Sequence, residues 1–216
     1  MTYQAVLFDL DGTLLDTLED LADAMNAALA DLECPARTLE EYRFFVGDGL
    51  RTYALRSLPT DRQDEETLRR CCESFRRAYA DGWRVKTRPY EGIAELLTRL
   101  TERGLVMTVL SNKPDDFTKV MVGELLGDWR FRIVRGVGAD GLKKPDPTGA
   151  VAIAEELEIA PEEFLYLGDT DTDMQTANAA GMFAVGATWG FRPASELTEN
   201  GAKELIDHPL DLLKLL

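Results

Sequence analysis

The chain has 216 residues, of which 45% are hydrophobic and 29% charged, values ordinary for a globular protein with one sizeable core, or with a core and a smaller accessory domain. Its formal net charge of −15 argues against nucleic acid and anionic membranes as partners, because both bind basic surfaces. No apolar run approaches the roughly 18 residues of a membrane helix, and no secretory signal is visible at the N-terminus, so a cytoplasmic location is expected.

The first predicted element is a buried strand at residues 5–9, an apolar run that ends in a carboxylate. From residue 17 to about 86 the pattern is helical. The segment Thr17–Asp20 resembles a capping box, and a long helix is predicted after it. Its apolar residues share one helical face: Leu18, Leu21, Ala22, Met25, Leu29 and Leu32. The spacing of Leu68, Cys71, Phe75 and Tyr79 predicts a second long helix.

Strand and helix patterns alternate over residues 88–190. Short apolar runs predict strands at 105–110, 133–134, 164–167 and 183–185, and helical spacing fills the intervals. This alternation predicts an α/β fold with a doubly wound parallel sheet, Rossmann-like, covered on both faces. The expected organisation is a core formed by residues 1–16 and 87–216, with an inserted all-helical domain at 17–86.

Two acidic residues close the first predicted strand. Asp9 and Asp11 lie two positions apart, so their side chains point to the same side of an extended segment. Paired carboxylates repel each other unless one is protonated or a cation lies between them. Gly12 allows a sharp exit from the strand, although Asp-Gly is also a common turn dipeptide and a plain turn is nearly as good an interpretation.

A second acidic group, Asp169, Asp171 and Asp173, directly follows the predicted strand at 164–167. Acidic residues are also favoured at a helix N-terminus, which accounts for Asp171. Asp169 differs because it comes before the helix begins. Carboxylate oxygens suit Mg²⁺, so Asp169 and Asp173 are candidate metal ligands together with Asp9 and Asp11.

Polar residues follow the remaining two strands. Ser111 and Asn112 come after the strand at 105–110 and could hold phosphate oxygens. Lys144 follows the strand near Ile133, in a segment stiffened by two prolines that could aim it inward. Because the carboxyl ends of parallel strands meet at one edge of the sheet, all four groups are expected to lie together. The joint placement favours a functional site over four unrelated turns.

These motifs resemble those of the haloacid dehalogenase superfamily, over essentially the whole chain. The resemblance rests on four groups in chain order: Asp9-Leu-Asp11-Gly-Thr-Leu with a further Asp16, Ser111, Lys144, and Gly168-Asp-x-x-x-Asp173. It implies a phosphatase that uses Mg²⁺ and acts on a small phosphorylated metabolite. Asp9 would be the nucleophile and Asp11 the general acid and base, Ser111 and Lys144 would hold the phosphoryl group, and Asp9, Asp11, Asp169 and Asp173 would serve the metal.

The helical insert resembles the α-helical cap of that superfamily, and its loop at Gly47 and Gly49 resembles phosphoglycolate phosphatases. Arg51 and Arg56 follow this loop and could meet a second charge on the substrate. Phosphoglycolate is therefore the expected ester, with a nucleotide, a sugar phosphate or pyrophosphate open.

Three other functions share part of this pattern. A dehalogenase would have no use for Asp11 or a metal cluster. A β-phosphoglucomutase-like phosphomutase shares every catalytic residue named above. A receiver-type signalling module also forms an aspartyl-phosphate, but the long helical insert and Asp11 favour turnover.

Overall fold

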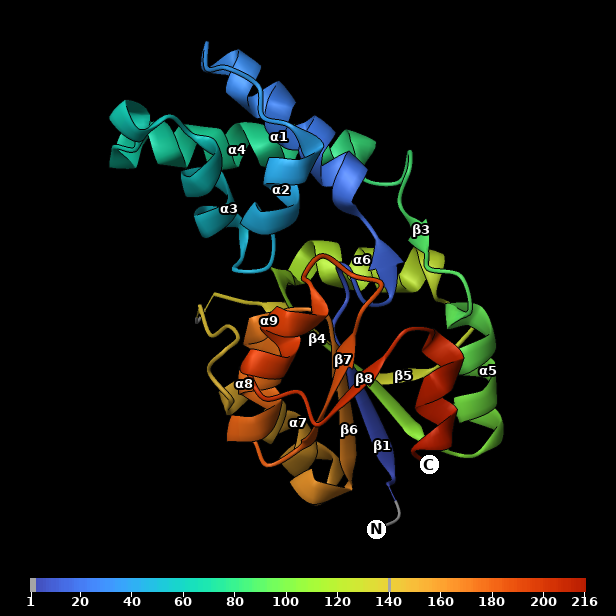
Figure 1. The fold of residues 1–216 in the computed structure, drawn as a ribbon. Helices are drawn as coiled ribbons and strands as arrows, with labels where there is room; N and C mark the ends of the chain where they lie inside the picture. Colours follow the sequence, from blue (N-terminus) through green and yellow to red (C-terminus); the bar gives the residue numbers. More distant parts are fainter. Residues whose placement is uncertain (1–2, 140) are drawn as a thin grey trace.

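The computed structural model describes residues 3–139 and 141–216, and its centre is a six-stranded sheet (Figure 1). The strand order is β5-β4-β1-β6-β7-β8, and every neighbouring pair is parallel. The strands are β1 (Ala5–Phe8), β4 (Val106–Pro114), β5 (Phe131–Val137), β6 (Phe164–Gly168), β7 (Phe183–Ala187) and β8 (Glu204–Ile206). The predicted doubly wound α/β fold is confirmed.

Side chains of β1 show how the sheet separates two apolar layers. Val6 and Phe8 lie in one core cluster and Ala5 and Leu7 in the other, as the alternation of a strand requires, and all four are fully buried. The first layer is formed by α5 (Ile93–Glu102), α6 (Asp115–Leu125) and the 3₁₀ helix η3 (Pro209–Lys214). The second is formed by α7 (Thr148–Leu157), α8 (Asp171–Ala179) and α9 (Ala194–Glu199).

A helical segment lies above the carboxyl ends of the strands (Figure 1). It contains α1 (Leu18–Asp31), α2 (Leu39–Phe45), α3 (Leu50–Ser57), the 3₁₀ turn η1 (Thr60–Arg62) and α4 (Glu65–Gly82). The chain enters and leaves it through a short antiparallel pair, β2 (Leu15–Asp16) with β3 (Arg88–Pro89). Two adjacent strands therefore connect the segment to the sheet.

The start of α1 differs from the predicted capping box. Thr17 is the N-cap residue but makes no side-chain capping bond, because its backbone is already in the helical region at φ −110° and ψ −3°. The buried carboxylate of Asp20 turns instead to the returning chain and accepts from the backbone N–H groups of Lys86 and Thr87 at 2.9 and 2.8 Å. The acidic residue of the motif thus joins the two connections rather than capping the helix.

Within the described residues, no helix combines the length and the apolar character needed to cross a membrane.

β8 was not predicted from the sequence, because it has only three residues and its first, Glu204, is exposed. It pairs with β7 and forms one edge of the sheet, so β4, β1 and β6 are interior strands.

Candidate active site

Three carboxylates converge at the carboxyl ends of β1 and β6. Single oxygens of Asp9, Asp169 and Asp173 all lie within 4.8 Å of one another, and all three residues are buried. Burial, and next the charge of Asp173, raise the pKa of Asp9 well above its usual range, although Lys144 opposes this. Three buried carboxylates this close require positive charge, and the structure provides part of it.

Asp169 is held by the loops on either side of it. Its Oδ1 accepts from the hydroxyl of Thr13 at 2.9 Å, and its Oδ2 accepts from the backbone N–H of Phe191 at 2.7 Å. Burial, and then the charge of Asp173, raise the pKa of Asp169 to about 7. A Cβ at Gly12, where φ is +88°, or at Gly190 would approach Asp169 atoms to 2.3 Å. Both glycines are therefore needed for the carboxylate to lie where it does.

The ammonium of Lys144 is the counter-ion inside this cluster. Its Nζ lies 2.6 Å from Asp9 Oδ1 and 2.7 Å from Asp173 Oδ1, and its side chain is only 2% exposed. Burial alone would lower the pKa of Lys144, but Asp173 and Asp9 outweigh it and raise that pKa well above its usual range. Asn112 fixes the lysine backbone, since its Oδ1 accepts from Lys144 N at 2.7 Å and its Nδ2 donates to Lys144 O at 3.0 Å.

Asp173 has the most protein partners of the three carboxylates. Its Oδ2 accepts from the backbone N–H and the hydroxyl of Thr170, at 3.1 and 2.7 Å, which forms a capping box at the start of α8. Its Oδ1 accepts from Lys144 and, at 3.3 Å, from the hydroxyl of Tyr166. Asp173 therefore orients Lys144 as well as adding to the acidic cluster.

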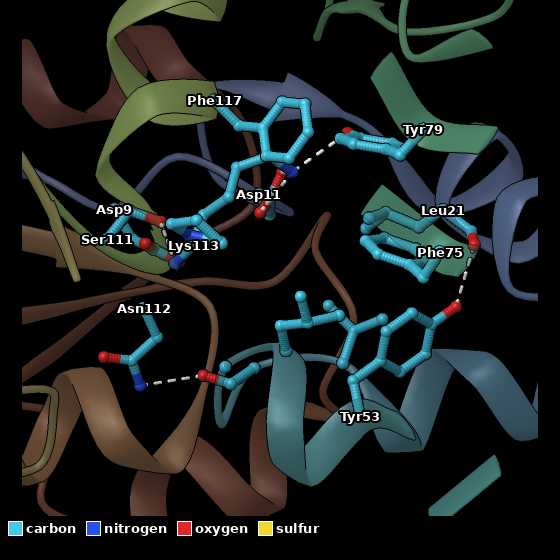
Figure 2. A pocket seen from close by; sticks show the side chains of 15 residues that line it. Asp9, Asp11, Leu21, Tyr53, Phe75, Tyr79, Ser111, Asn112, Lys113 and Phe117 are labelled. Carbon is cyan, nitrogen blue, oxygen red and sulfur yellow. Dashed lines mark hydrogen bonds and ion pairs between the residues drawn. The ribbon is translucent and has the colours of Figure 1, made fainter. Parts of the chain in front are cut away.

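Asp11 lies beside the cluster but turns toward Lys113, a residue for which the sequence predicted no role. Lys113 Nζ contacts Asp11 Oδ1 and Oδ2 at 2.9 and 3.0 Å and the hydroxyl of Tyr79 on α4 at 2.9 Å (Figure 2). The sequence did place Lys113 near the site, because it directly follows the candidate residues Ser111 and Asn112. The sequence could not predict the direction of the Lys113 side chain, because its partner Tyr79 has the spacing of an ordinary apolar residue on an amphipathic helix.

A pocket opens over Asp9 and Asp11 between the sheet edge and the helical segment (Figure 2). Its free volume is about 50 Å³. Apart from the polar residues of the sheet edge, its lining is largely apolar: Leu21, Val46, Leu50, Tyr53, Phe75, Tyr79, Pro114 and Phe117. Gly47 and Gly49 also line it, and Gly47 O accepts from Asn112 Nδ2 at 2.9 Å. The glycine loop and the motif after β4 thus meet directly.

The predicted residues fall into two groups. Those brought together at the sheet edge are Asp9, Asp11, Ser111, Asn112, Lys144, Asp169 and Asp173, with Gly47 and Gly49 facing them. Arg51 and Arg56 are not among the pocket-lining residues. Arg51 pairs with Glu65 at 2.7 Å and Arg56 with Asp48 at 2.6 Å. The Asn112 side chain bonds to Lys144 and Gly47, so its amide serves to hold the site together.

Comparison with known proteins agrees with this arrangement. A sequence profile of the family described as haloacid dehalogenase-like hydrolase matches residues 6–187. The chain belongs to the haloacid dehalogenase-like hydrolases. The family assignment made from the four motifs is therefore confirmed, and the match includes the helical segment as well as the sheet edge.

Relatives of this hydrolase cover nearly its full length. Phosphoglycolate phosphatase 1 of Pseudomonas aeruginosa is 33% identical over 214 residues, spanning 96% of this chain and 78% of that protein. The phosphoglycolate phosphatase of Nitrosospira multiformis is 35% identical over 220 residues, spanning 99% and 95%. A solved structure from Lactobacillus delbrueckii subsp. bulgaricus superposes with a TM-score of 0.90 at 30% identity, covering 100% of this chain and 98% of that one.

Proposed function

We propose that this hydrolase is a Mg²⁺-dependent phosphatase that cleaves a small phosphate monoester through an aspartyl-phosphate, with phosphoglycolate as the best candidate. The main support for the proposal is that the carboxylates at the sheet edge have two different surroundings. Asp9 lies in the cluster with Asp169, Asp173 and Lys144, while Asp11 lies outside it at the pocket. One carboxylate can thus act as the nucleophile while another transfers protons.

In the proposed first step an oxygen of Asp9 forms a bond to phosphorus as the bond from phosphorus to the ester oxygen breaks. Asp11 gives a proton to the departing oxygen, so the alcohol leaves neutral. In the second step water attacks phosphorus and gives its proton to Asp11, and the bond from phosphorus to Asp9 breaks. Ser111 and the ammonium of Lys144 would hold the phosphoryl oxygens during both steps, because Ser111, within β4, and Lys144, in the loop after β5, line the same cavity.

The acidic cluster fits a divalent cation. Asp9 and Asp169 would hold it directly, with the backbone carbonyl of Asp11, and a bound cation would offset the repulsion between the carboxylates and the phosphate. Asp173 already accepts from Thr170, Lys144 and Tyr166, so a water-mediated contact suits it better. Oxygen ligands of this kind favour Mg²⁺.

The helical segment is proposed to act as a cap domain that selects the ester, with residues 17–86 as the cap and 1–16 and 87–216 as the core. Leu21, Val46 and Tyr53 of this segment line the pocket over Asp9 and Asp11, so the segment is placed to contact the part of the ester beyond the phosphate. The relatives named phosphoglycolate phosphatase support phosphoglycolate as that ester.

The test is a panel of phosphate esters assayed with Mg²⁺ and with EDTA. Phosphoglycolate should release inorganic phosphate fastest, and EDTA should stop the reaction. Release that persists in EDTA would contradict the metal dependence. A rearranged sugar phosphate in place of inorganic phosphate would indicate a mutase, and a stable phosphoprotein without turnover would indicate a signalling module.

Gly190→Ala is expected to reduce phosphate release by about 100-fold, because a Cβ there would lie 2.3 Å from the Cβ of Asp169 and displace that carboxylate. The Mg²⁺ concentration for half-maximal activity should rise as well. Gly123→Ala in α6 is the matched control, since a Cβ there meets nothing within 4 Å. Equal activity of the two variants would show that the position of Asp169 tolerates the shift.

Contact of Arg51 and Arg56 with a substrate charge remains a prediction from the sequence. If either arginine leaves its ion pair to bind the ester, Arg51→Ala or Arg56→Ala should raise the Michaelis constant for phosphoglycolate by roughly tenfold, the size of one charged contact. Glu65→Ala removes the partner of Arg51 and keeps the arginine, so it serves as the control. An unchanged Michaelis constant in both arginine variants would exclude the contact.

A further inference from the structure

Lys113 is a buried cation that the proposed steps do not use. Its side chain is 4% exposed, and it lies at the end of β4 on the wall of the pocket. The ammonium has three donor hydrogens, and three oxygens surround it at 2.9 to 3.0 Å: both carboxylate oxygens of Asp11 and the hydroxyl of Tyr79. Its donors are thus directed to the protein rather than to the open part of the pocket.

Tyr79 is held firmly in the helical segment. Its ring stacks on Phe75 at a centroid distance of 5.2 Å and meets Phe117 of α6 edge-on at 5.1 Å. Lys113 Nζ also lies over the Tyr79 ring, 4.6 Å from its centre, a distance at which a cation is attracted to an aromatic face. The hydroxyl and the ring therefore fix the ammonium from the side opposite Asp11.

Within residues 3–139 and 141–216, the Asp11 carboxylate bonds to no side chain other than Lys113, and it lies near the exit of β1 where the chain turns at Gly12. A short acidic side chain at such a turn can adopt several rotamers unless a partner selects one. Lys113 is that partner. A proton-transfer group displaced by about 1 Å can lose on the order of 100-fold in rate, so this selection matters for the reaction.

We infer that Lys113 is a positioning residue that aims the Asp11 carboxylate, and that Tyr79 of the helical segment holds Lys113 for this purpose. The inference rests on the proposed function, in which Asp11 transfers the protons. The proton-transfer step then depends on α4. Asp11 is aligned only when the helical segment packs against the core so that Tyr79 contacts Lys113.

The experiment compares Lys113→Met and Tyr79→Phe with the wild type on two esters. One is phosphoglycolate or another alkyl phosphate, whose leaving oxygen needs a proton. The other is p-nitrophenyl phosphate, whose phenolate leaves without one. Because kcat/KM reports events up to the first irreversible step, it should fall by about 100-fold for the alkyl ester in Lys113→Met and by less than about threefold for the nitrophenyl ester. Tyr79→Phe, which keeps the ring, should show the same pattern at about tenfold.

Turnover should respond differently from kcat/KM. Hydrolysis of the aspartyl-phosphate still needs Asp11 as a base, so kcat should fall for both esters in Lys113→Met. Lys119→Met is the matched control, because that lysine on α6 pairs with Asp115 at 60% side-chain exposure. Its kinetics should equal those of the wild type.

With an active wild-type enzyme, two results would overturn the inference. An equal loss of kcat/KM on both esters, in Lys113→Met or in Tyr79→Phe, would indicate general damage to the site. A raised Michaelis constant for phosphoglycolate alone, with kcat retained, would make Lys113 a substrate-binding residue. If the wild type releases phosphate from neither ester, the proposed function fails and the inference fails with it. A wild-type enzyme that is active while its variants lose both esters equally would contradict only the inference.

Discussion

Replacing Asp9 by asparagine is expected to reduce phosphate release by roughly 10⁴-fold or more, the scale seen when an enzyme loses its nucleophile. The amide has nearly the same shape as the carboxylate, but its oxygen is a poor nucleophile and cannot take part in the same two-step exchange. Measurement of phosphate release from phosphoglycolate with Mg²⁺ checks this directly.

The same variant should remain folded. Burial and the neighbouring Asp173 raise the pKa of Asp9, so the ionised carboxylate is disfavoured where it lies. An asparagine removes that charge, and Lys144 keeps its second contact with Asp173 at 2.7 Å. We therefore expect the melting temperature to stay within a few degrees of the wild-type value, so that the loss of activity reflects chemistry.

Asp171→Asn is the control for Asp9→Asn. Asp171 lies in the first turn of α8, close to the cluster in sequence, and it is not one of the three clustered carboxylates. Its activity should be unchanged, and its stability should fall by no more than about 1 kcal/mol, the value of one acidic residue at a helix N-terminus. Persisting activity in Asp9→Asn would place the nucleophile elsewhere.

The residues at the sheet edge were predictable because each follows an apolar run that reads as a buried parallel strand. Asp9 and Asp169 directly follow such runs, β1 and β6, and Lys144 lies in the loop after the partly exposed strand β5; parallel strands bring these ends together. The strands before Asp9 and Asp169 are buried throughout, whereas β5 is partly exposed, so the inward direction of Lys144 depends on its loop and not on its strand.

The contacts made by the helical segment were not predictable in the same way. Tyr79 belongs to a regular apolar stripe on α4, and only the packing of α4 beside α6 shows that its hydroxyl meets Lys113. Arg51 precedes Glu65 by 14 positions, and their ion pair depends on how α3 packs on α4. Periodicity shows which face of a helix is buried, but it does not show what a polar group on that face touches.

Lys144→Met is expected to lower stability by about 3–5 kcal/mol, the usual cost of removing one partner from a buried ion pair. The ammonium is the side-chain cation in contact with both Asp9 and Asp173, so its loss leaves three buried carboxylates close together. For a chain of this length the melting temperature should fall by roughly 6–20 °C in the absence of metal. Thermal unfolding in EDTA measures this effect without reference to activity.

Mg²⁺ should recover part of that loss, because a cation held by the same carboxylates replaces the missing positive charge and binds only the folded state. The rise in melting temperature on adding Mg²⁺ should therefore be larger in Lys144→Met than in the wild type. Lys143→Met is the matched control, since that neighbouring ammonium is exposed and donates to the backbone oxygen of Asp48 at 2.8 Å. If the two lysine variants unfold at the same temperature in EDTA, Lys144 is not the counter-ion of the cluster, and the carboxylates must be neutralised by protons instead.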